Sequence, residues 1–314
     1  MDAAPAIGVD VGGTKIAAGV VDATGNVILR RQIQTEAADE RAVVAGIVKV
    51  CRELQASAPG ALALGVGAAG LVDHERGVVI NAPNISWRNV HLRAMLQDRL
   101  NLRVAVDNDA NVAALGEALY GAGRGAGDQV MVTVGTGVGG GLVIGGRIYR
   151  GARGLGAEIG HMVIAADGPA CACGNRGCLE VMASGNAIGR LARERAGSPD
   201  AAALVERAGS VEAVTGEAVT EAASAGDPFA AGVVAEAGGW LGLGVANLVN
   251  VLDPDVVIVG GGAAAGCGEL LLGPARDSMA AHLLGRPDRA PPPMIPASLG
   301  RDAGLVGAAA LTRA

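Results

Sequence analysis

The chain has 314 residues, of which 51 are glycine and 2% are aromatic, so we expect two lobes with cores of Ala, Val, Leu and Ile instead of rings. A net charge of -6 argues against nucleic acid as the main partner. We find no signal peptide and no uninterrupted apolar stretch of about 18 residues, and the five cysteines fit a reducing compartment, which together predict a cytoplasmic protein without a membrane span.

The first part of the chain is predicted to combine strands with helices. A meander of three strands comes first, because its turns carry the Gly, Asn and Asp that favour tight reversals. Two apolar strands follow, among segments with helical spacing. The predicted strands span 7–10, 16–21, 27–34, 62–67 and 102–106, and the predicted helices span 40–56, 92–100 and 111–120.

The second part begins by repeating the first. The segment VMVTVGTGVGGGLVIG has the same order as IGVDVGGTKIAAGVV, namely a strand, a turn of Gly and Thr, and a second strand. The similarity predicts an internal duplication, with two related lobes that each begin with a hairpin large enough to hold a phosphate. We further expect strands over 130–134, 138–144 and 256–259, a helical region over 185–251, an exposed connector over 286–296 and a final helix from 304.

The densest group of reactive side chains lies within 156–180. Thiolates and imidazole are zinc ligands, and a site with four protein ligands leaves no position for water, so it is structural. Gly174 and Gly177 would allow the tight turn that such a site needs. Three reduced core thiols are the alternative, but three of five cysteines within eight residues argue against it. The predicted Zn²⁺ ligands are His161, Cys171, Cys173 and Cys178.

Three glycine turns follow predicted strands. Backbone N–H groups in such turns can approach an anion closely. The first turn is no Walker A loop, because it lacks the arch before its lysine and leads into a strand. One such turn could equally be an ordinary hairpin, but three at strand ends predict contacts to one nucleotide. The turns consist of Gly12, Gly13, Thr14 and Lys15; Gly135, Thr136 and Gly137; and Gly260, Gly261 and Gly262.

Asp107, Asn108 and Asp109 stand together between a predicted buried strand and a predicted helix. One of them is expected to cap the helix, for which Asn and Asp are favoured. A cap needs only one polar residue, and a carboxylate at this point can accept a proton from a sugar hydroxyl as general base. Asp109 is our candidate. Glu158, within the metal segment, is a candidate hydrogen-bond acceptor, whereas Asn84 by itself is only a loop asparagine.

Taken together, four motifs in this order resemble the ROK family of sugar kinases and repressors, and most strongly its bacterial ATP-dependent glucokinases of the actinobacterial type. The resemblance covers nearly the whole chain. It implies an actin/hexokinase-like ATPase fold, in which two α/β lobes of duplicated ribonuclease-H-like topology, 1–118 with 301–314 and 119–300, enclose a cleft. The motifs are Asp10-Val11-Gly12-Gly13-Thr14-Lys15, Asp107-Asn108-Asp109-Ala110-Asn111, Glu158-Ile159-Gly160-His161 and Cys171-Ala172-Cys173-Gly174-Asn175-Arg176-Gly177-Cys178-Leu179-Glu180.

The resemblance also implies an activity and its residues. The expected reaction transfers the γ-phosphoryl group of ATP to the 6-hydroxyl of glucose, with Asp109 as base and Asp10 near Mg²⁺ through water. The first two glycine turns would hold the ATP phosphates, and zinc would bind the histidine and three cysteines. Relatives suggest a homodimer or homotetramer. The sugar hydroxyls would be held by Asn84, Asn108, Glu158, His161 and Glu180.

Several alternatives remain open at this point. Other kinases of the same family phosphorylate N-acyl hexosamines or fructose, or use polyphosphate; Thr14 and Lys15 look more like the ATP users. A sugar-sensing repressor would add an N-terminal winged-helix domain, and only six residues precede the first predicted strand. A non-catalytic sugar-binding protein would not need Asp109 or the hairpins. Leu179 departs from the aromatic residue that many relatives carry there, which affects the expected shape of the sugar pocket but not the metal site.

Overall fold

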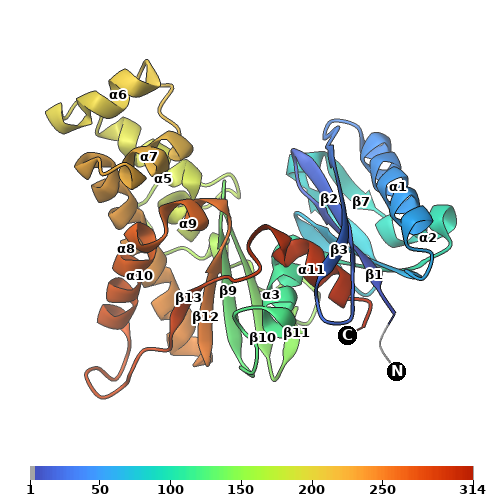
Figure 1. Cartoon of the computed structure of the whole chain (residues 1–314). Helices are drawn as coiled ribbons and strands as arrows, with labels where there is room; N and C mark the ends of the chain where they lie inside the picture. Colours follow the sequence, from blue (N-terminus) through green and yellow to red (C-terminus); the bar gives the residue numbers. More distant parts are fainter. Residues whose placement is uncertain (1–3, 314) are drawn as a thin grey trace. The chain divides into compact units, whose positions relative to one another are not determined.

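Two five-stranded sheets with the same strand order form the frame of the computed structural model, which describes residues 4–313 (Figure 1). The chain divides into two compact units. Unit 1 contains residues 1–127, 141–157 and 298–314, and unit 2 contains residues 128–140 and 158–297. The lobes implied by the family resemblance remain a prediction; the compact units differ from them mainly in assigning 141–157 to unit 1.

The first sheet has the order β3-β2-β1-β4-β8. Strands β1 to β3 form the predicted antiparallel meander, and β4 and β8 add to it in parallel. At the β2–β3 turn, Asp22 Oδ1 accepts from the backbone N–H groups of Thr24 and Asn26, which fixes the tight reversal. The strands are β1 (Ala6–Val11), β2 (Lys15–Val21), β3 (Val27–Gln34), β4 (Ala63–Ala68) and β8 (Arg103–Asn108).

The second sheet repeats this order as β11-β10-β9-β12-β13. Strand β12 is parallel to both β9 and β13, as β4 is to β1 and β8. The internal duplication predicted from the repeated hairpin is therefore confirmed. The strands are β9 (Gln129–Val134), β10 (Val138–Ile144), β11 (Arg147–Tyr149), β12 (Val256–Gly260) and β13 (Met294–Pro296).

Glycine lets the helices of unit 1 pack directly on its sheet. A Cβ atom at Gly8 would lie 2.0 Å from the carbonyl oxygen of Leu305, and one at Gly65 would lie 1.6 Å from that of Ala308. Both oxygens belong to α11, so the abundance of glycine replaces aromatic bulk with close backbone contact. The helices of unit 1 are α1 (Glu40–Ser57), α2 (Leu92–Leu100), α3 (Asp109–Tyr120) and α11 (Ala303–Ala310), with the 3₁₀ turn η4 (Gly300–Asp302).

A small antiparallel sheet completes unit 1. Its strands are β5 (Leu71–Asp73), β6 (Val78–Ala82) and β7 (Trp87–Val90), and the turn η1 (Pro83–Ile85) joins the last two. None of these strands was expected, because each is short and polar residues interrupt its apolar pattern. The buried Trp87 packs in the main core of this unit.

Unit 2 is mainly helical outside its sheet. The long helix α8 lies against α10, and glycines again permit the contact: a Cβ at Gly242 would lie 2.1 Å from the carbonyl oxygen of Ala275. The elements are η2 (Ile159–His161), α4 (Leu179–Ala183), α5 (Gly185–Glu194), η3 (Pro199–Ala201), α6 (Ala202–Ala208), α7 (Gly216–Ser224), α8 (Pro228–Leu252), α9 (Gly262–Cys267) and α10 (Glu269–His282).

One expectation for this part of the chain needs correction. The segment 286–296 is not only an exposed connector, because its end forms β13, which pairs with β12 and buries Met294.

Among the described residues, α8 is the one helix long and apolar enough to be compared with a membrane span. Glu236 and several glycines interrupt it, and 56% of its apolar window is buried within the fold, so it is a core helix here and the expectation of no uninterrupted apolar stretch stands.

Candidate functional site

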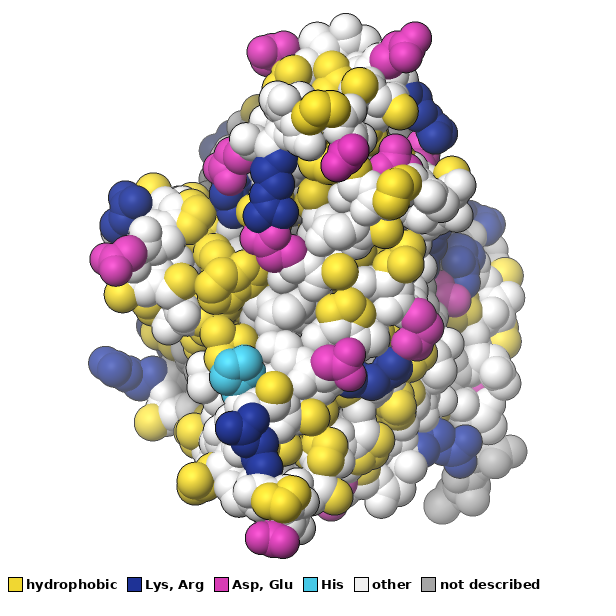
Figure 2. Space-filling model, turned by 90° about the vertical axis from the view of Figure 1, so that its left-hand side faces the viewer, with side chains coloured by type: hydrophobic (Ala, Val, Ile, Leu, Met, Phe, Trp, Pro, Cys, Tyr) yellow, Lys and Arg dark blue, Asp and Glu magenta, His cyan; other side chains and the backbone are white. Residues whose placement is uncertain are grey.

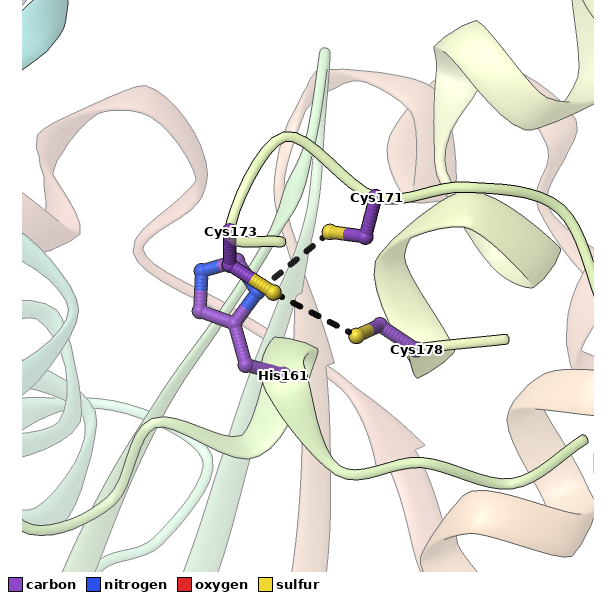
Figure 3. A group of neighbouring side chains, drawn as sticks. All are labelled: His161, Cys171, Cys173 and Cys178. Atoms are coloured by element: carbon purple, nitrogen blue, oxygen red, sulfur yellow. Dashed lines mark hydrogen bonds between the residues drawn. The ribbon is translucent and has the colours of Figure 1, made fainter. Parts of the chain in front are cut away.

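The four predicted metal ligands come together in unit 2 (Figure 3). Their donor atoms all lie within 4.8 Å of one another. Cys171 Sγ is 3.7 Å from His161 Nδ1, and Cys173 Sγ is 3.6 Å from Cys178 Sγ. The histidine ends η2, Cys178 stands at the N-terminus of α4, and the other two cysteines lie in the turn between them.

Local backbone geometry creates this cluster. Gly174 and Gly177 have positive φ angles of 95° and 61°, and a Cβ atom at Gly177 would lie 1.5 Å from the carbonyl oxygen of Ala165. The backbone N–H of Cys171 donates to the carbonyl of Asn175 at 2.8 Å, which closes the turn around Cys173. The predicted need for glycine at these two positions is confirmed.

The donor set fits a tetrahedral zinc ion. Zinc–sulfur bonds of about 2.3 Å at tetrahedral angles place two sulfur atoms about 3.8 Å apart, close to the separation of Cys173 and Cys178. The backbone N–H of Asn175, followed by Cys171, lowers the pKa of Cys173, which favours the thiolate that a metal needs. Burial, followed by the neighbouring Cys173 and Cys171 thiols, raises the pKa of Cys178 to about 12, as burial does for Cys51 in the unit 1 core, so a thiolate at Cys178 would depend on a bound cation.

The end of the metal segment contacts the second glycine turn. Glu180 Oε2 accepts a hydrogen bond of 3.1 Å from the backbone N–H of Val138. A Cβ atom at Gly137 would lie 2.2 Å from the same oxygen, so only glycine lets the carboxylate approach this far. The backbone N–H of Gly185 donates to the carbonyl of Gly135 at 2.8 Å. Sequence analysis predicted both features but not their contact.

The third glycine turn lies beside the second. β9 and β12 are adjacent parallel strands, and the turns follow their carboxyl ends. Gly261 has φ 94°, and a Cβ atom there would lie 2.4 Å from the carbonyl oxygen of Val134. Gly262 then begins α9. The edge of a parallel sheet beyond its carboxyl ends is the usual position for ligands in such folds.

The first glycine turn lies in unit 1, at the β1–β2 hairpin. The backbone N–H of Gly12 donates to the carbonyl of Lys15 at 3.0 Å, and Thr35 Oγ1 donates to the carbonyl of Gly12 at 2.8 Å. Thr14 and Lys15 are exposed. Gly13 approaches Asn84, since a Cβ there would lie 3.2 Å from the Asn84 carbonyl oxygen. The structure therefore brings Asn84 next to this turn.

Asn108 caps α3, so the cap does not depend on the side chain of Asp109. Asn108 Oδ1 accepts from the backbone N–H groups of Ala110 and Asn111 at 2.8 and 3.1 Å, while its Nδ2 donates to the carbonyl of Gly70 at 3.0 Å. Both ends of the Asn108 side chain therefore serve the fold. Asp109 is the first residue of α3.

Asp109 and Asp10 influence each other electrostatically. Burial raises the pKa of Asp109, although hydrogen bonds from Ala110 and Asn108 oppose the rise. Burial, and then the charge of Asp109, raise the pKa of Asp10 to about 6, with Lys15 opposing. The first turn of α11 lies against the Asp10 carboxylate, at Gly304. Two carboxyl groups, those of Asp10 and Asp109, thus lie close enough to interact, with Asp10 in the strand that leads into the first glycine turn, and both take up a proton more readily than usual.

The predicted residues fall into two sets. Unit 1 holds the first glycine turn with Asp10, Asn84, Asn108 and Asp109. Unit 2 holds the other two turns, the metal ligands, Glu158 and Glu180. Glu158 is exposed and directly precedes η2.

Sequence reasoning missed two charged side chains that shape the unit 1 set. Arg150 pairs with Asp107 at 2.7 Å, and the buried Glu117 accepts from the backbone N–H groups of Ala122, Ser298 and Leu299. Their partners lie 43 to 182 residues away along the chain, except for Ala122, so local patterns carry no signal for them.

The duplicated sheets define an actin/hexokinase-like ATPase fold. The model of the ROK family matches residues 6–314, and the chain belongs to the ROK family. It is 42% identical to a glucokinase of Streptomyces coelicolor over 98% of this chain and 97% of the relative.

Solved structures agree with this assignment. A ROK family glucokinase from Streptomyces griseus, crystallised in complex with glucose and AMPPNP, is 43% identical, with a TM-score of 0.89 over 98% of this chain and 99% of that one. A ROK hexokinase from Thermus thermophilus is 36% identical, with a TM-score of 0.82 over 98% and 97%.

Proposed function

We propose that this protein is an ATP-dependent glucokinase, which transfers the γ-phosphoryl group of ATP to the 6-hydroxyl of glucose. The observation that carries the proposal is the position of Asp109, a carboxylate of raised pKa at the start of α3 whose charge acts on Asp10, in the strand that leads into the first glycine turn. Similarity over nearly the full chain to glucokinases supports the same activity.

Asp109 is proposed as the general base. A base acts best when its pKa lies near the working pH, and burial moves that of Asp109 in this direction. Because Asn108 already caps α3, the neighbouring carboxylate is not needed for the cap. Asp109 would accept the proton of the sugar hydroxyl as that oxygen attacks phosphorus. Phosphoryl transfer asks little covalent chemistry of the protein, so positioning supplies most of the rate.

The sugar is proposed to contact Asn84, Asn108, Glu158, His161 and Glu180. His161 faces Cys171 through Nδ1, which leaves Nε2 for a sugar hydroxyl while the other nitrogen serves the metal. Glu180 accepts from Val138, and a carboxylate oxygen can accept further hydrogen bonds. With 2% aromatic residues, the chain has few rings for stacking on a pyranose, so hydrogen bonds dominate sugar binding.

The nucleotide is proposed to bind at the three glycine turns. The N–H groups of Gly12 and Gly135 are used within their own hairpins, so other backbone N–H groups of the turns, with Thr14 and Lys15, would contact the phosphates of ATP. Mg²⁺ would neutralise charge on the phosphates, and Asp10 would hold it through water. Since the pKa of Asp10 is about 6, this carboxylate is mainly ionised at neutral pH.

The cysteine cluster is proposed to hold structural Zn²⁺. Four protein ligands fill a tetrahedral shell, so the ion supplies rigidity and no open coordination position. The ligands would then fix η2 and α4, which carry His161 and Glu180. We also propose a cytoplasmic homodimer or homotetramer without a nucleic-acid partner. On the face drawn in Figure 2, basic and acidic side chains are interspersed and form no basic patch.

The test is phosphorylation of a hexose panel with ATP, GTP and polyphosphate as donors. We expect the highest kcat/KM with glucose and ATP, above mannose and well above N-acetylglucosamine and fructose. A clear preference for an acetylated sugar, for fructose or for polyphosphate would replace glucokinase by another kinase of the family. Hexose binding without turnover would indicate a sugar sensor.

A further inference from the structure

Asp107 is the most buried charged side chain of the strand–helix junction, with 1% of its surface exposed. Its two oxygens have different partners. Oδ1 accepts from the backbone N–H of Asn108 at 2.8 Å and from Asn111 Nδ2 at 3.1 Å, so it holds the junction itself. Oδ2 accepts from Arg150 Nε at 2.7 Å and lies 3.6 Å from His74 Nδ1. Both oxygens thus bind neighbouring parts of the protein, and the near-complete burial of Asp107 suits a structural contact better than a contact with substrate.

Arg150 is the first residue of the loop that runs from β11 to Glu158. It follows β11, and its carbonyl accepts from the backbone N–H of Gly156 at 2.9 Å, which returns the chain to its starting point. A Cβ at Gly156 would lie 3.1 Å from that carbonyl oxygen, so the closure is tight. After Gly156 come only Ala157, with a positive φ of 67°, and then Glu158.

We infer that Asp107 and Arg150 form a positioning pair, which joins the segment carrying Asp109 to the loop that presents Glu158. The inference rests on the proposed function, because that function assigns both Asp109 and Glu158 to the sugar. Neither member of the pair needs to touch the substrate. Each acts through the segment that it holds, so loss of the pair lets the base and the sugar acceptor move independently.

The chemistry of the pair favours a positioning role over a merely stabilising one. A buried ion pair adds little stability relative to an apolar pair, because desolvation offsets the attraction, although removal of one partner alone is costly; its hydrogen bonds fix the geometry of the two segments. The guanidinium here donates from a planar group to one defined carboxylate oxygen. Asp107 lies two residues before the proposed base, and Asn111 lies two residues after it. Movement of this carboxylate is therefore transmitted directly to Asp109.

The substitution Asp107→Asn separates the two functions of this side chain. The amide oxygen can still accept from Asn108 and Asn111, while the amide nitrogen replaces Oδ2, so the hydrogen bond from Arg150 is lost together with the weaker 3.6 Å contact to His74. Arg150→Gln breaks the same contact from the other side. Arg153→Gln is the matched control, because Arg153 is exposed in the same loop. Arg150→Lys keeps the charge but not the planar geometry.

We expect kcat/KM for glucose to fall about 10-fold or more in Asp107→Asn and Arg150→Gln, and the double variant to resemble either single variant because one contact is lost in all three. The glucose dissociation constant, measured by calorimetry without nucleotide, should rise in parallel. KM for ATP should stay within about 2-fold, Arg150→Lys should be intermediate, and Arg153→Gln should match the wild type.

Two outcomes would overturn the pair. One is a lowered melting temperature while glucose binding and turnover, both measured well below that temperature, are unchanged. This result would show a structural role only. The other is additive loss in the double variant. Failure of the proposed function looks different: Asp109→Asn would retain its turnover, or no hexose would be phosphorylated, whatever the glucose affinity of Asp107→Asn and Arg150→Gln.

Discussion

Two of the segments that carry proposed sugar contacts, residues 156–180 and the junction at 107–109, are held in place by different chemistry. Residues 156–180 close on themselves around four soft ligands within one stretch of chain, so a single ion can fix their geometry. The junction at Asp107, Asn108 and Asp109 is instead fixed by hydrogen bonds and by Arg150 from another part of the chain. In the metal segment one ion would fix the whole geometry, whereas in the junction several separate hydrogen bonds share this role.

This difference can be tested first by removing the ion. Cys173→Ala should release zinc and disorder the loop, because structural zinc sites contribute about 10–16 kcal/mol of apparent binding free energy. Turnover should become undetectable, and proteolysis should cut within 156–180. Zinc content by elemental analysis is the direct measurement, and Cys267→Ala, outside the cluster, is the control. Active wild-type protein without zinc would contradict a structural ion.

Substitution of Asp109 in the junction should change the melting temperature little but should lower turnover strongly. Asp109→Asn keeps the shape of the side chain but cannot accept the hydroxyl proton, so kcat should fall about 10²-fold or more while glucose and ATP still bind. The melting temperature should change little, because Asn108 provides the cap. Asp98→Asn, exposed on α2, is a suitable control. Retention of most of kcat would remove Asp109 from the mechanism.

The contact between the metal segment and the second glycine turn gives a smaller expected effect. Gly137→Ala places a methyl group where Glu180 Oε2 now lies, so the turn and α4 must separate. We expect KM for ATP to rise about 10-fold, equivalent to about 1.4 kcal/mol, with zinc retained. Gly232→Ala, where a Cβ meets no atom within 4 Å, serves as the control. An unchanged KM for ATP would show that Gly137 takes no part in nucleotide binding.

The neighbouring carboxyl groups of Asp10 and Asp109 should make the stability of the fold depend on pH. Because the folded-state pKa of Asp10 is about 6, above its ordinary 3.8, its favourable contribution is complete below pH 3.8 and is lost as the pH rises through 6. Asp10→Asn removes the charge and should therefore be more stable than the wild type by up to about 3 kcal/mol at pH 7.5, the equivalent of the shift in pKa. Denaturant unfolding at pH 7.5 and pH 4 measures this. A difference that persists undiminished at pH 4 would have another cause.

The sequence by itself determined the features that depend on neighbouring residues. The metal ligands lie within eighteen residues, and their glycines mark the turn, so composition and spacing were sufficient. The repeated hairpin likewise predicted the duplicated sheets, since strand order follows from a repeated chain. The fold and the family could be assigned from these local motifs.

Only the tertiary structure decided which distant side chains support the site. Arg150 and Asp107 are 43 residues apart, and Glu180 meets Val138 across 42, so no periodicity marks either contact. The short strands β5 to β7, and β13 in a proline-rich segment, acquire their structure from pairing with a neighbour and carry too few residues to show a period. The pKa values of Asp10 and Asp109 belong to the same class, because burial raises them and burial is a property of the folded chain.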